Sequence, residues 1–214
     1  MKACIFDLDG VLVDTAKYHF IAWQRLANNL QVDFTEHDNE QLKGLSRDAS
    51  LDYILKKGKI TASSSEKEVW KEQKNNWYLE LVNTMQEDEV LPNCKELLGD
   101  LKSNGVKIGL GSASKNAALI LSRVKIKHFF DVIIDGTVTS KSKPDPEVFL
   151  LGAKALALEP NECLVFEDAI NGVKAAKAGG FTTIGIGEKE VLTEADLVFT
   201  DLRSLNYEVL NRIV

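Results

Sequence analysis

The sequence has little cysteine and no long hydrophobic run. Three cysteines at wide spacings among 214 residues give no disulfide framework, and no close Cys/His pair suggests a zinc site. A chain of this kind is typical of the reducing cytoplasm. No stretch approaches the roughly 20 apolar residues of a membrane span, and Asp7 and Asp9 interrupt the first apolar run too early for a signal peptide. We therefore expect a cytoplasmic protein that uses no membrane.

The sequence also has no excess of positive charge. Its formal net charge is -6 and its pI is about 5.2, without a long basic run. This argues against nucleic acid or an anionic membrane as the main partner. With 44% hydrophobic residues, the chain can bury a sizeable core in one large domain or two modest ones. No apolar heptad or obvious partner strand is present, so a monomer is expected.

The order of apolar patterns along the chain indicates the fold. A short buried strand at 3–6 is followed by an all-helical stretch from 15 to about 85. In that stretch, Phe20, Trp23, Leu26, Ala27 and Leu30 form one apolar stripe. Further helices are expected around 36–42, after a cap at Ser46 or Asp48, and after the loop at 63–66, the last one carrying Val69, Trp70, Trp77, Leu81, Val82 and Met85.

Beyond the polar break at 86–89 the texture changes to alternating strands and helices. Strands are expected at 106–111, 130–134, 163–168, 182–186 and 197–200, with helices between them, the first having Pro92 in its opening turn. Alternation of this kind predicts a parallel sheet covered on both faces. The expected fold is α/β: a doubly wound, Rossmann-like core (1–14 plus 88–214) with an all-α helical cap (15–87) inserted after the first strand.

Four polar clusters directly follow predicted strands: Asp7 with Asp9, the segment 112–116, Lys143, and Glu167 with Asp168. The carboxyl ends of parallel strands meet at one edge, where such sheets bind ligands. Carboxylates suit Mg²⁺ and can also act as a nucleophile or as a general acid and base. Serine hydroxyls, helix N-terminal N–H groups and a lysine suit phosphate oxygens. Together the clusters predict phosphoryl transfer.

Each cluster also has a simpler interpretation. Asp-x-Asp-Gly is a common turn, Ser112 and Ser114 could be helix caps, Lys143 could be a solvated loop residue, and Glu167 with Asp168 could favour the next helix N-terminus. Taken together, these readings require four unrelated coincidences in the right order.

The same segments resemble the four motifs of the haloacid dehalogenase superfamily of phosphotransferases: Asp7-x-Asp9-Gly10-Val11-Leu12-Val13-Asp14-Thr15, Ser112-Ala113-Ser114, Lys143-Pro144-Asp145-Pro146 and Phe166-Glu167-Asp168. The helical insertion, with Thr15-Ala16-x-Tyr18-His19-Phe20-x-Ala22-Trp23 and Lys43-Gly44-Leu45-Ser46-Arg47, is similar to the cap of the β-phosphoglucomutase family. The resemblance implies interconversion of β-glucose 1-phosphate and glucose 6-phosphate through an aspartyl phosphate and β-glucose 1,6-bisphosphate.

The resemblance also implies a role for each motif residue. Asp7 is expected to be the nucleophile and a Mg²⁺ ligand, and Asp9 the general acid and base, with its backbone carbonyl on the metal. Glu167 and Asp168 complete the metal site. Thr15 lies at the hinge, and His19 senses closure of the cap. The residues expected around the sugar phosphate are Asp9, His19, Trp23, Lys43, Gly44, Arg47, Ser112, Ala113, Ser114, Asn116 and Lys143.

The cap decides between alternatives that the core motifs leave open. Arg47 suits a second phosphate, because a guanidinium binds phosphate bidentately, but it could also be a surface arginine at a helix start. His19 could be a packing histidine, and Trp23, Trp70 and Trp77 are most simply cap core. The alternative enzyme is a Mg²⁺-dependent sugar-phosphate phosphatase of the same superfamily. A binding protein that has lost turnover is the alternative from another class.

Overall fold

The computed structural model describes residues 1–213 and contains one six-stranded sheet, in which all the paired strands are parallel. The strand order is β3-β2-β1-β4-β5-β6, so the order reverses between β1 and β4. The strands are β1 (Ala3–Phe6), β2 (Lys107–Gly111), β3 (Val132–Ile134), β4 (Cys163–Glu167), β5 (Thr182–Ile186) and β6 (Leu197–Phe199). Every strand expected from the sequence is present, and the doubly wound α/β fold is confirmed.

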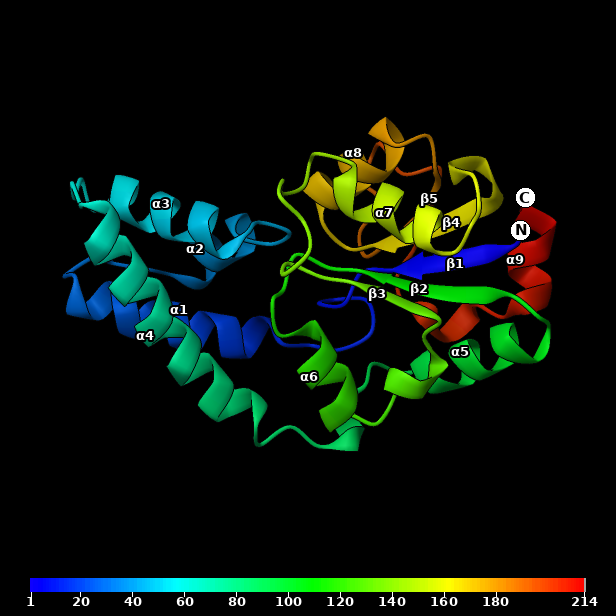
Figure 1. The fold of residues 1–214 in the computed structure, drawn as a ribbon, viewed down its shortest axis with the longest axis horizontal. Helices are drawn as coiled ribbons and strands as arrows, with labels where there is room; N and C mark the ends of the chain where they lie inside the picture. The colour runs from blue at the N-terminus through cyan, green and yellow to red at the C-terminus, as the bar shows by residue number, and fades with distance from the viewer. Residues whose placement is uncertain (214) are drawn as a thin grey trace.

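The helices of the core lie on both faces of the sheet (Figure 1). They are α5 (Cys94–Ser103), α6 (Ala117–Arg123), α7 (Glu147–Ala155), α8 (Ile170–Ala178) and α9 (Tyr207–Ile213). Helices α7 and α8 lie on one face, and α5, α6 and α9 lie on the other. The helix at the polar break begins at Cys94, two residues after the predicted turn at Pro92, because Asn93 takes a left-handed backbone conformation with φ 64°.

Strand β1 is buried on both faces, which explains its continuous apolar sequence. Successive side chains point to opposite faces of a strand. Ala3 and Ile5 therefore pack with α7 and α8, while Cys4 and Phe6 pack with the helices of the other face. All four residues are fully buried. The strand that carries Asp7 at its end is therefore covered by helices on both faces.

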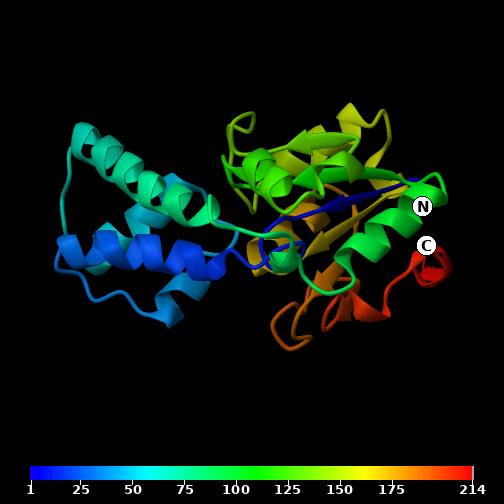
Figure 2. The ribbon, with the colours of Figure 1, turned by 90° about the horizontal axis from the view of Figure 1, so that it is seen from below.

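The segment between β1 and α5 is helical, as predicted, and forms a cap. Its helices are α1 (Ala16–Asn29), α2 (Glu36–Gln41), α3 (Arg47–Lys57) and α4 (Ser64–Val82). Figures 1 and 2 show these four helices gathered at one end of the molecule, away from the sheet. Trp23 and Leu26 from α1 pack on Leu51 and Ile54 from α3 in a separate apolar cluster, with Trp70 and Trp77 partly buried at its margin.

Two short stretches connect the cap to the core, and they lie side by side. Val13 and Val90 form an antiparallel bridge, and the Leu91 N–H donates to the Leu12 carbonyl at 2.9 Å. The chain therefore leaves and re-enters the core at one place.

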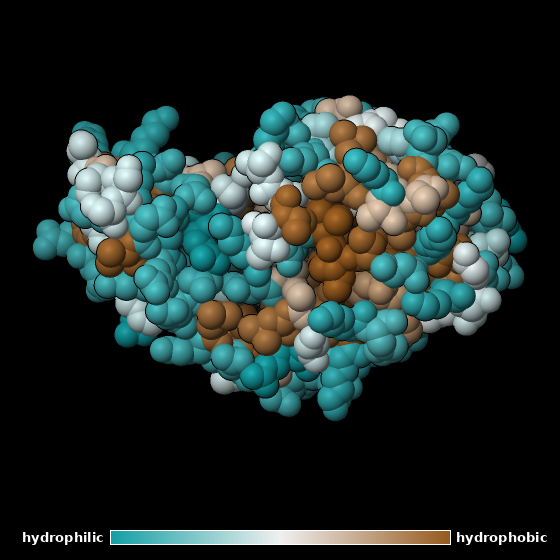
Figure 3. Space-filling view, in the orientation of Figure 1, coloured by the Kyte–Doolittle hydropathy of each residue, from teal (hydrophilic) through white to brown (hydrophobic). Residues whose placement is uncertain are grey.

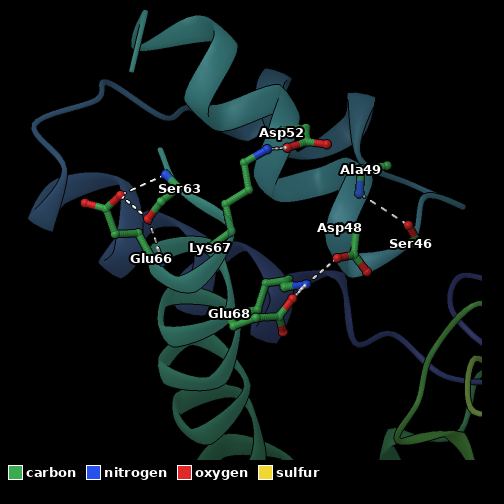
Figure 4. Close-up of polar contacts among 9 residues, drawn as sticks. Ser46, Asp48, Ala49, Asp52, Ser63, Glu66, Lys67 and Glu68 are labelled. Carbon is green, nitrogen blue, oxygen red and sulfur yellow. Dashed lines mark hydrogen bonds and ion pairs between the residues drawn. The ribbon is translucent and has the colours of Figure 1, made fainter. Parts of the chain in front are cut away.

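Polar side chains fix the ends of the cap helices (Figure 4). The Ser46 hydroxyl accepts from the Ala49 N–H at 3.3 Å and caps α3, as predicted, and Ser63 caps α4 with Glu66 in a capping box. Lys67 of α4 pairs with Asp52 of α3 at 2.7 Å. The consequence for function is that the first residue of α3, Arg47, is held in a defined place.

Helix α4 differs from its expected pattern. It ends at Val82, before Met85, and Val69 is 51% exposed. Its buried positions are instead Lys74, Tyr78 and Val82, which follow one another at four-residue spacing. Figure 3 shows a mostly hydrophilic cap surface, with hydrophobic side chains gathered over the core instead. Among residues 1–213, no helix is both long enough and apolar enough to cross a membrane.

Candidate active site

A cavity of about 140 Å³ lies where the carboxyl ends of the strands face the cap. It is placed at the reversal of strand order, because β1 and β4 carry Asp7 and Asp168 at their ends. The predicted site residues that line it are Asp7, Asp9, His19, Trp23, Lys43, Gly44, Arg47, Ser112, Ala113, Ser114, Asn116 and Asp168. Thr15, Lys143 and Glu167, by contrast, are buried outside this lining.

Lys143 lies behind Asp7 and joins it to the neighbouring strand. Its ammonium group donates to Asp7 Oδ1 at 2.5 Å and to Glu167 Oε2 at 2.9 Å. Burial alone would lower the pKa of Lys143, but the two carboxylates raise it well above its ordinary value. The lysine is therefore charged at neutral pH, and its ammonium group holds one oxygen of the Asp7 carboxylate in place.

Asp7, Glu167 and Asp168 form a carboxylate cluster in which one oxygen of each lies within 4.8 Å of the others. Burial, then repulsion from Asp7, raises the pKa of Glu167 and raises that of Asp168 to about 7. Lys143 and Lys43, which lies 3.7 Å from Asp168 Oδ2, bring two positive charges to three carboxylates, so the cluster favours a further cation. Oxygen ligands alone suit Mg²⁺, and the acidic cluster therefore fits the divalent metal that the sequence predicts.

The Asp9 side chain takes a different direction from that of Asp7. Asp9 Oδ1 accepts a hydrogen bond from the Thr15 hydroxyl, while the backbone N–H of Asp9 donates to Asp7 Oδ2 at 3.1 Å. Burial, reinforced by Asp7 and Asp168, raises the pKa of Asp9 well above its ordinary range. A carboxyl group in this state can carry a proton at neutral pH and can donate it.

The segment after β2 presents donors and hydroxyl groups to the cavity. Ser112 is almost fully buried, and its N–H donates to the Ile134 carbonyl at 3.0 Å. The Ser112 hydroxyl accepts from the Ser114 N–H at 3.1 Å, and the Ser114 hydroxyl accepts from the Asn116 N–H at 3.2 Å. These bonds give the loop one shape, with Asn116 at the N-terminus of α6.

On the cap side, His19 and Lys74 contact each other in the wall of the cavity. Lys74 Nζ lies 2.8 Å from His19 Nδ1 and 4.5 Å from the centre of the Trp23 ring, and the His19 ring stacks on Tyr78. Lys74 is only 3% exposed. Burial, followed by the charge of Arg47, lowers the pKa of Lys74, and burial with Lys74 lowers that of His19. Both groups are therefore biased towards their neutral forms.

Sequence reasoning missed Lys74 and Asn75. In the sequence Lys74 is one charged residue among many in α4, although it falls at four-residue spacing with Trp70, Tyr78 and Val82. That spacing is the signal that could have placed it on the inner face of the helix. Asn75 has no comparable signal, because its importance depends on residues from two other helices.

Arg47 and Lys43 bring positive charge from the cap to the cavity. Arg47 Nη2 donates to Asn75 Oδ1 at 2.6 Å, and Asn116 Nδ2 donates to the same oxygen at 3.0 Å. Lys43 Nζ lies 3.7 Å from Asp168 Oδ2 and thus links cap to core at the metal-binding cluster. The cavity therefore has a carboxylate and lysine end in the core and a guanidinium end at the cap.

These features define the chain as a phosphotransferase built on a doubly wound sheet. A family model described as haloacid dehalogenase-like hydrolase matches residues 1–180, and the chain belongs to that family.

Two comparisons narrow the relationship further. The chain is 41% identical over 213 residues to the β-phosphoglucomutase of Bacillus subtilis strain 168, a match that covers 99% of this chain and 94% of the relative. The crystal structure of β-phosphoglucomutase from Clostridium difficile superposes with a TM-score of 0.97 at 41% identity, covering 100% of this chain and 96% of that one.

A phosphatase is also among the relatives, at lower identity. The phosphorylated carbohydrates phosphatase of Thermotoga maritima is 32% identical over 206 residues, which cover 92% of this chain and 93% of the relative. The chain is therefore more similar to these two mutases than to this phosphatase.

Proposed function

We propose that this chain is a β-phosphoglucomutase that interconverts β-D-glucose 1-phosphate and β-D-glucose 6-phosphate. The observation that carries the proposal is a cavity with two ends suited to phosphate. Asp7, Ser112 and Lys143 stand at or behind the core end, and Arg47 and Asn116 converge at the other. A sugar that carries two phosphates needs both ends, whereas a phosphatase acting on a small monophosphate needs only one.

The chemistry at the core end is nucleophilic transfer by Asp7. An Asp7 carboxylate oxygen forms a bond to phosphorus while the bond to the sugar oxygen breaks, giving an aspartyl phosphate and a sugar hydroxyl. Asp9 supplies the proton that the leaving oxygen takes up. Its raised pKa and its position two residues beyond the nucleophile support this role. In the opposite direction, Asp9 accepts the proton of the attacking hydroxyl.

Lys143 and the serine loop stabilise the transferring group. The Lys143 ammonium already donates to Asp7, so it places positive charge beside the phosphoryl oxygens as they approach. Ser112, with the backbone around Ala113, presents hydrogen-bonding groups from the end of β2. Asp7, Glu167, Asp168 and the Asp9 carbonyl would hold Mg²⁺, which supplies further neutralisation of negative charge when bound.

The cap end holds the second phosphate while the first reacts. Arg47, Ser114 and Asn116 are the proposed ligands of this distal phosphate, and His19, Trp23, Lys43 and Gly44 surround the sugar, with Lys74 added by the structure. The intermediate is β-glucose 1,6-bisphosphate, which must turn to present its other phosphate to Asp7. We propose that the cap (15–87) moves on the core (1–14 plus 88–214) about Thr15 and the adjacent connection, and thereby excludes water.

The remaining sequence predictions concern the state of the protein. We propose a monomer in the cytoplasm whose partner is a small sugar phosphate. Cys4, Cys94 and Cys163 are free and buried, which agrees with a reducing compartment. Burial raises the pKa of the Cys94 thiol to about 12 and that of Cys163 to about 11, so neither thiol is set up as a nucleophile.

A product assay tests the proposed function. The enzyme is incubated with β-glucose 1-phosphate, Mg²⁺ and a trace of β-glucose 1,6-bisphosphate, and both glucose 6-phosphate and inorganic phosphate are measured. Glucose 6-phosphate as the main product supports the mutase. Inorganic phosphate as the main product would instead establish the phosphatase.

Replacement of Asp7 tests the nucleophile itself. Asp7→Ala removes the only oxygen pair that the proposed transfer can use, so all phosphoryl transfer is expected to disappear. Circular dichroism and thermal melting check that the variant folds. Transfer that survives in a folded Asp7→Ala protein would contradict the assignment.

A further inference from the structure

Asn75 joins two proposed ligands of the distal phosphate, Arg47 and Asn116. It lies on the inner side of α4, between Arg47 at the start of α3 and Asn116 at the start of α6. Its Oδ1 accepts from the Arg47 guanidinium at 2.6 Å and from the Asn116 amide at 3.0 Å. Asn75 Oδ1, in the cap, thus accepts from one donor in the cap, Arg47, and from one donor in the core, Asn116.

The identity of the atoms follows from the donors. Arginine carries only N–H donors, so the Asn75 atom that faces Arg47 is the amide oxygen and not the nitrogen. With that oxygen fixed, Asn116 contributes its NH₂ group to the second bond. Two convergent donors around one oxygen are also the arrangement that binds a phosphate oxygen.

We propose that Asn75 is an internal ligand of the distal site: its amide oxygen takes the place of a phosphate oxygen in the free enzyme and is displaced when phosphate binds. The inference rests on the proposed function, in which Arg47 and Asn116 receive the distal phosphate. Asn75 is then a positioning residue. It keeps both donors in place and holds cap to core in the free enzyme. It can also re-occupy the site whenever the distal phosphate dissociates so that the bisphosphate can reorient.

The sign of its effect on affinity is fixed by thermodynamics. A contact that exists only in the free enzyme must be given up on binding, so it weakens the apparent affinity for the ligand that displaces it. The neutral Asn75 amide competes only weakly with phosphate for Arg47, so phosphate can displace it. A carboxylate at the same place would pair with Arg47 by charge-assisted hydrogen bonds and would compete far more strongly.

Asn75→Ala and Asn75→Asp therefore have opposite expected effects. Both variants are titrated with inorganic phosphate at constant ionic strength in the presence of Mg²⁺, and the Asn116 side-chain amide signals are followed by NMR, because they report on the distal site. Asn75→Ala is expected to bind phosphate as tightly as the parent protein or more tightly. Asn75→Asp is expected to bind it about tenfold more weakly. Asn76→Ala and Asn76→Asp, at the exposed next position, are the matched controls and should behave as the parent.

A second measurement reads the link between cap and core without any ligand. The distance between a dye on the cap and a dye on the core should widen or vary more in Asn75→Ala than in Asn76→Ala, and Asn75→Asp should remain as closed as the parent protein. In turnover, Asn75→Asp should raise KM for β-glucose 1,6-bisphosphate more than it lowers kcat.

Two results would overturn the proposal. If Asn75→Ala loses phosphate affinity as Asn75→Asp does, Asn75 binds the anion directly and is not displaced by it. If both variants titrate like the Asn76 controls, the hydrogen bonds from Arg47 and Asn116 to Asn75 do not affect phosphate affinity. The phosphate titration does not depend on the product formed, so failure of the mutase assay and failure of this inference are separate outcomes.

Discussion

Gly172 is a single residue on which the position of Glu167 depends. It lies in α8, and a Cβ atom built on it would come within 2.0 Å of the Glu167 carboxyl carbon. Real Cβ atoms do not approach other atoms so closely, so the carboxyl group would have to move. Glu167 has no free space, because it is fully buried and held by Lys143 and the Ala169 N–H.

We therefore expect Gly172→Ala to lower activity strongly while the fold persists. Displacement of a reacting or charge-bearing group by about 1 Å can cost on the order of 100-fold in rate. The measurement is kcat at saturating Mg²⁺, together with the Mg²⁺ concentration that gives half activity.

The matched control is Gly99→Ala in α5, where the nearest atom would lie 3.9 Å away. This variant should keep full activity and gain about 0.4–1 kcal/mol of stability, because alanine restricts the unfolded chain. If Gly172→Ala were as active as Gly99→Ala, the placement of Glu167 would not matter to the reaction.

At the scale of elements, the start of α2 is held by a buried ionic network. Asp38 completes the capping box with Thr35 and also accepts from Tyr53 at 2.9 Å and from Lys57 of α3. Burial alone would raise the pKa of Asp38, but the hydrogen bonds from Lys57, Thr35 and Tyr53 outweigh it and hold the pKa well below its ordinary value. This network ties α2 to α3, the two helices that flank the loop with Lys43 and Gly44.

Asp38→Asn should destabilise the protein at neutral pH by about 1–3 kcal/mol, since it removes a buried hydrogen-bonded charge. A depressed pKa stabilises the fold above the ordinary carboxyl pKa of about 4, and that contribution is lost as the pH falls towards the folded-state pKa. The difference in the free energy of unfolding between parent and variant should therefore become smaller as the pH falls from 7 to 3. Urea unfolding at the two pH values measures it.

Asp52→Asn provides the comparison for this experiment. Asp52 of α3 pairs with Lys67 of α4 on the exposed surface of the cap, and exposed pairs contribute about 0–1 kcal/mol. A gap for Asp38→Asn that stays constant from pH 7 to pH 3 would contradict the proposed origin of its stabilisation.

At the scale of the whole molecule, function depends on how the cap covers Asp7 and Asp9. His19 contacts Lys74 of α4 and stacks on Tyr78, so it joins α1 to α4 in the wall of the cavity. The His19 N–H donates to the Thr15 carbonyl at 3.0 Å, and the Thr15 hydroxyl donates to Asp9, so His19 is joined to the proposed hinge. In the proposed mechanism, the cap excludes water from the phosphorylated Asp7 only if this wall stays intact.

His19→Ala should raise hydrolysis relative to transfer several-fold, because water gains access to the phosphorylated Asp7. The ratio of inorganic phosphate to glucose 6-phosphate formed from β-glucose 1-phosphate measures the effect. His37→Ala, at an exposed position of α2, should leave the ratio unchanged. An unchanged ratio in His19→Ala as well would mean that His19 does not guard the intermediate.

The sequence by itself determined the α/β fold and which residues lie at the carboxyl edge of the sheet. Buried apolar runs ending in Asp7 and in Glu167-Asp168 predict parallel strands, and parallel strands bring their carboxyl ends together whatever the loops do. The motif residues could be predicted for the same reason, since each lies within a few residues of a strand end or helix start.

Only the tertiary structure decided which side chains meet across the cavity. Asp7 and Asp9 are alike in sequence, yet one is held by Lys143 and the other by Thr15. Lys74 and Asn75 gain their importance from residues on α1, α3 and α6, which local sequence does not specify. Local patterns fix helices and strands, whereas the partner of a side chain depends on which elements pack opposite it, and those elements come together only in the folded molecule.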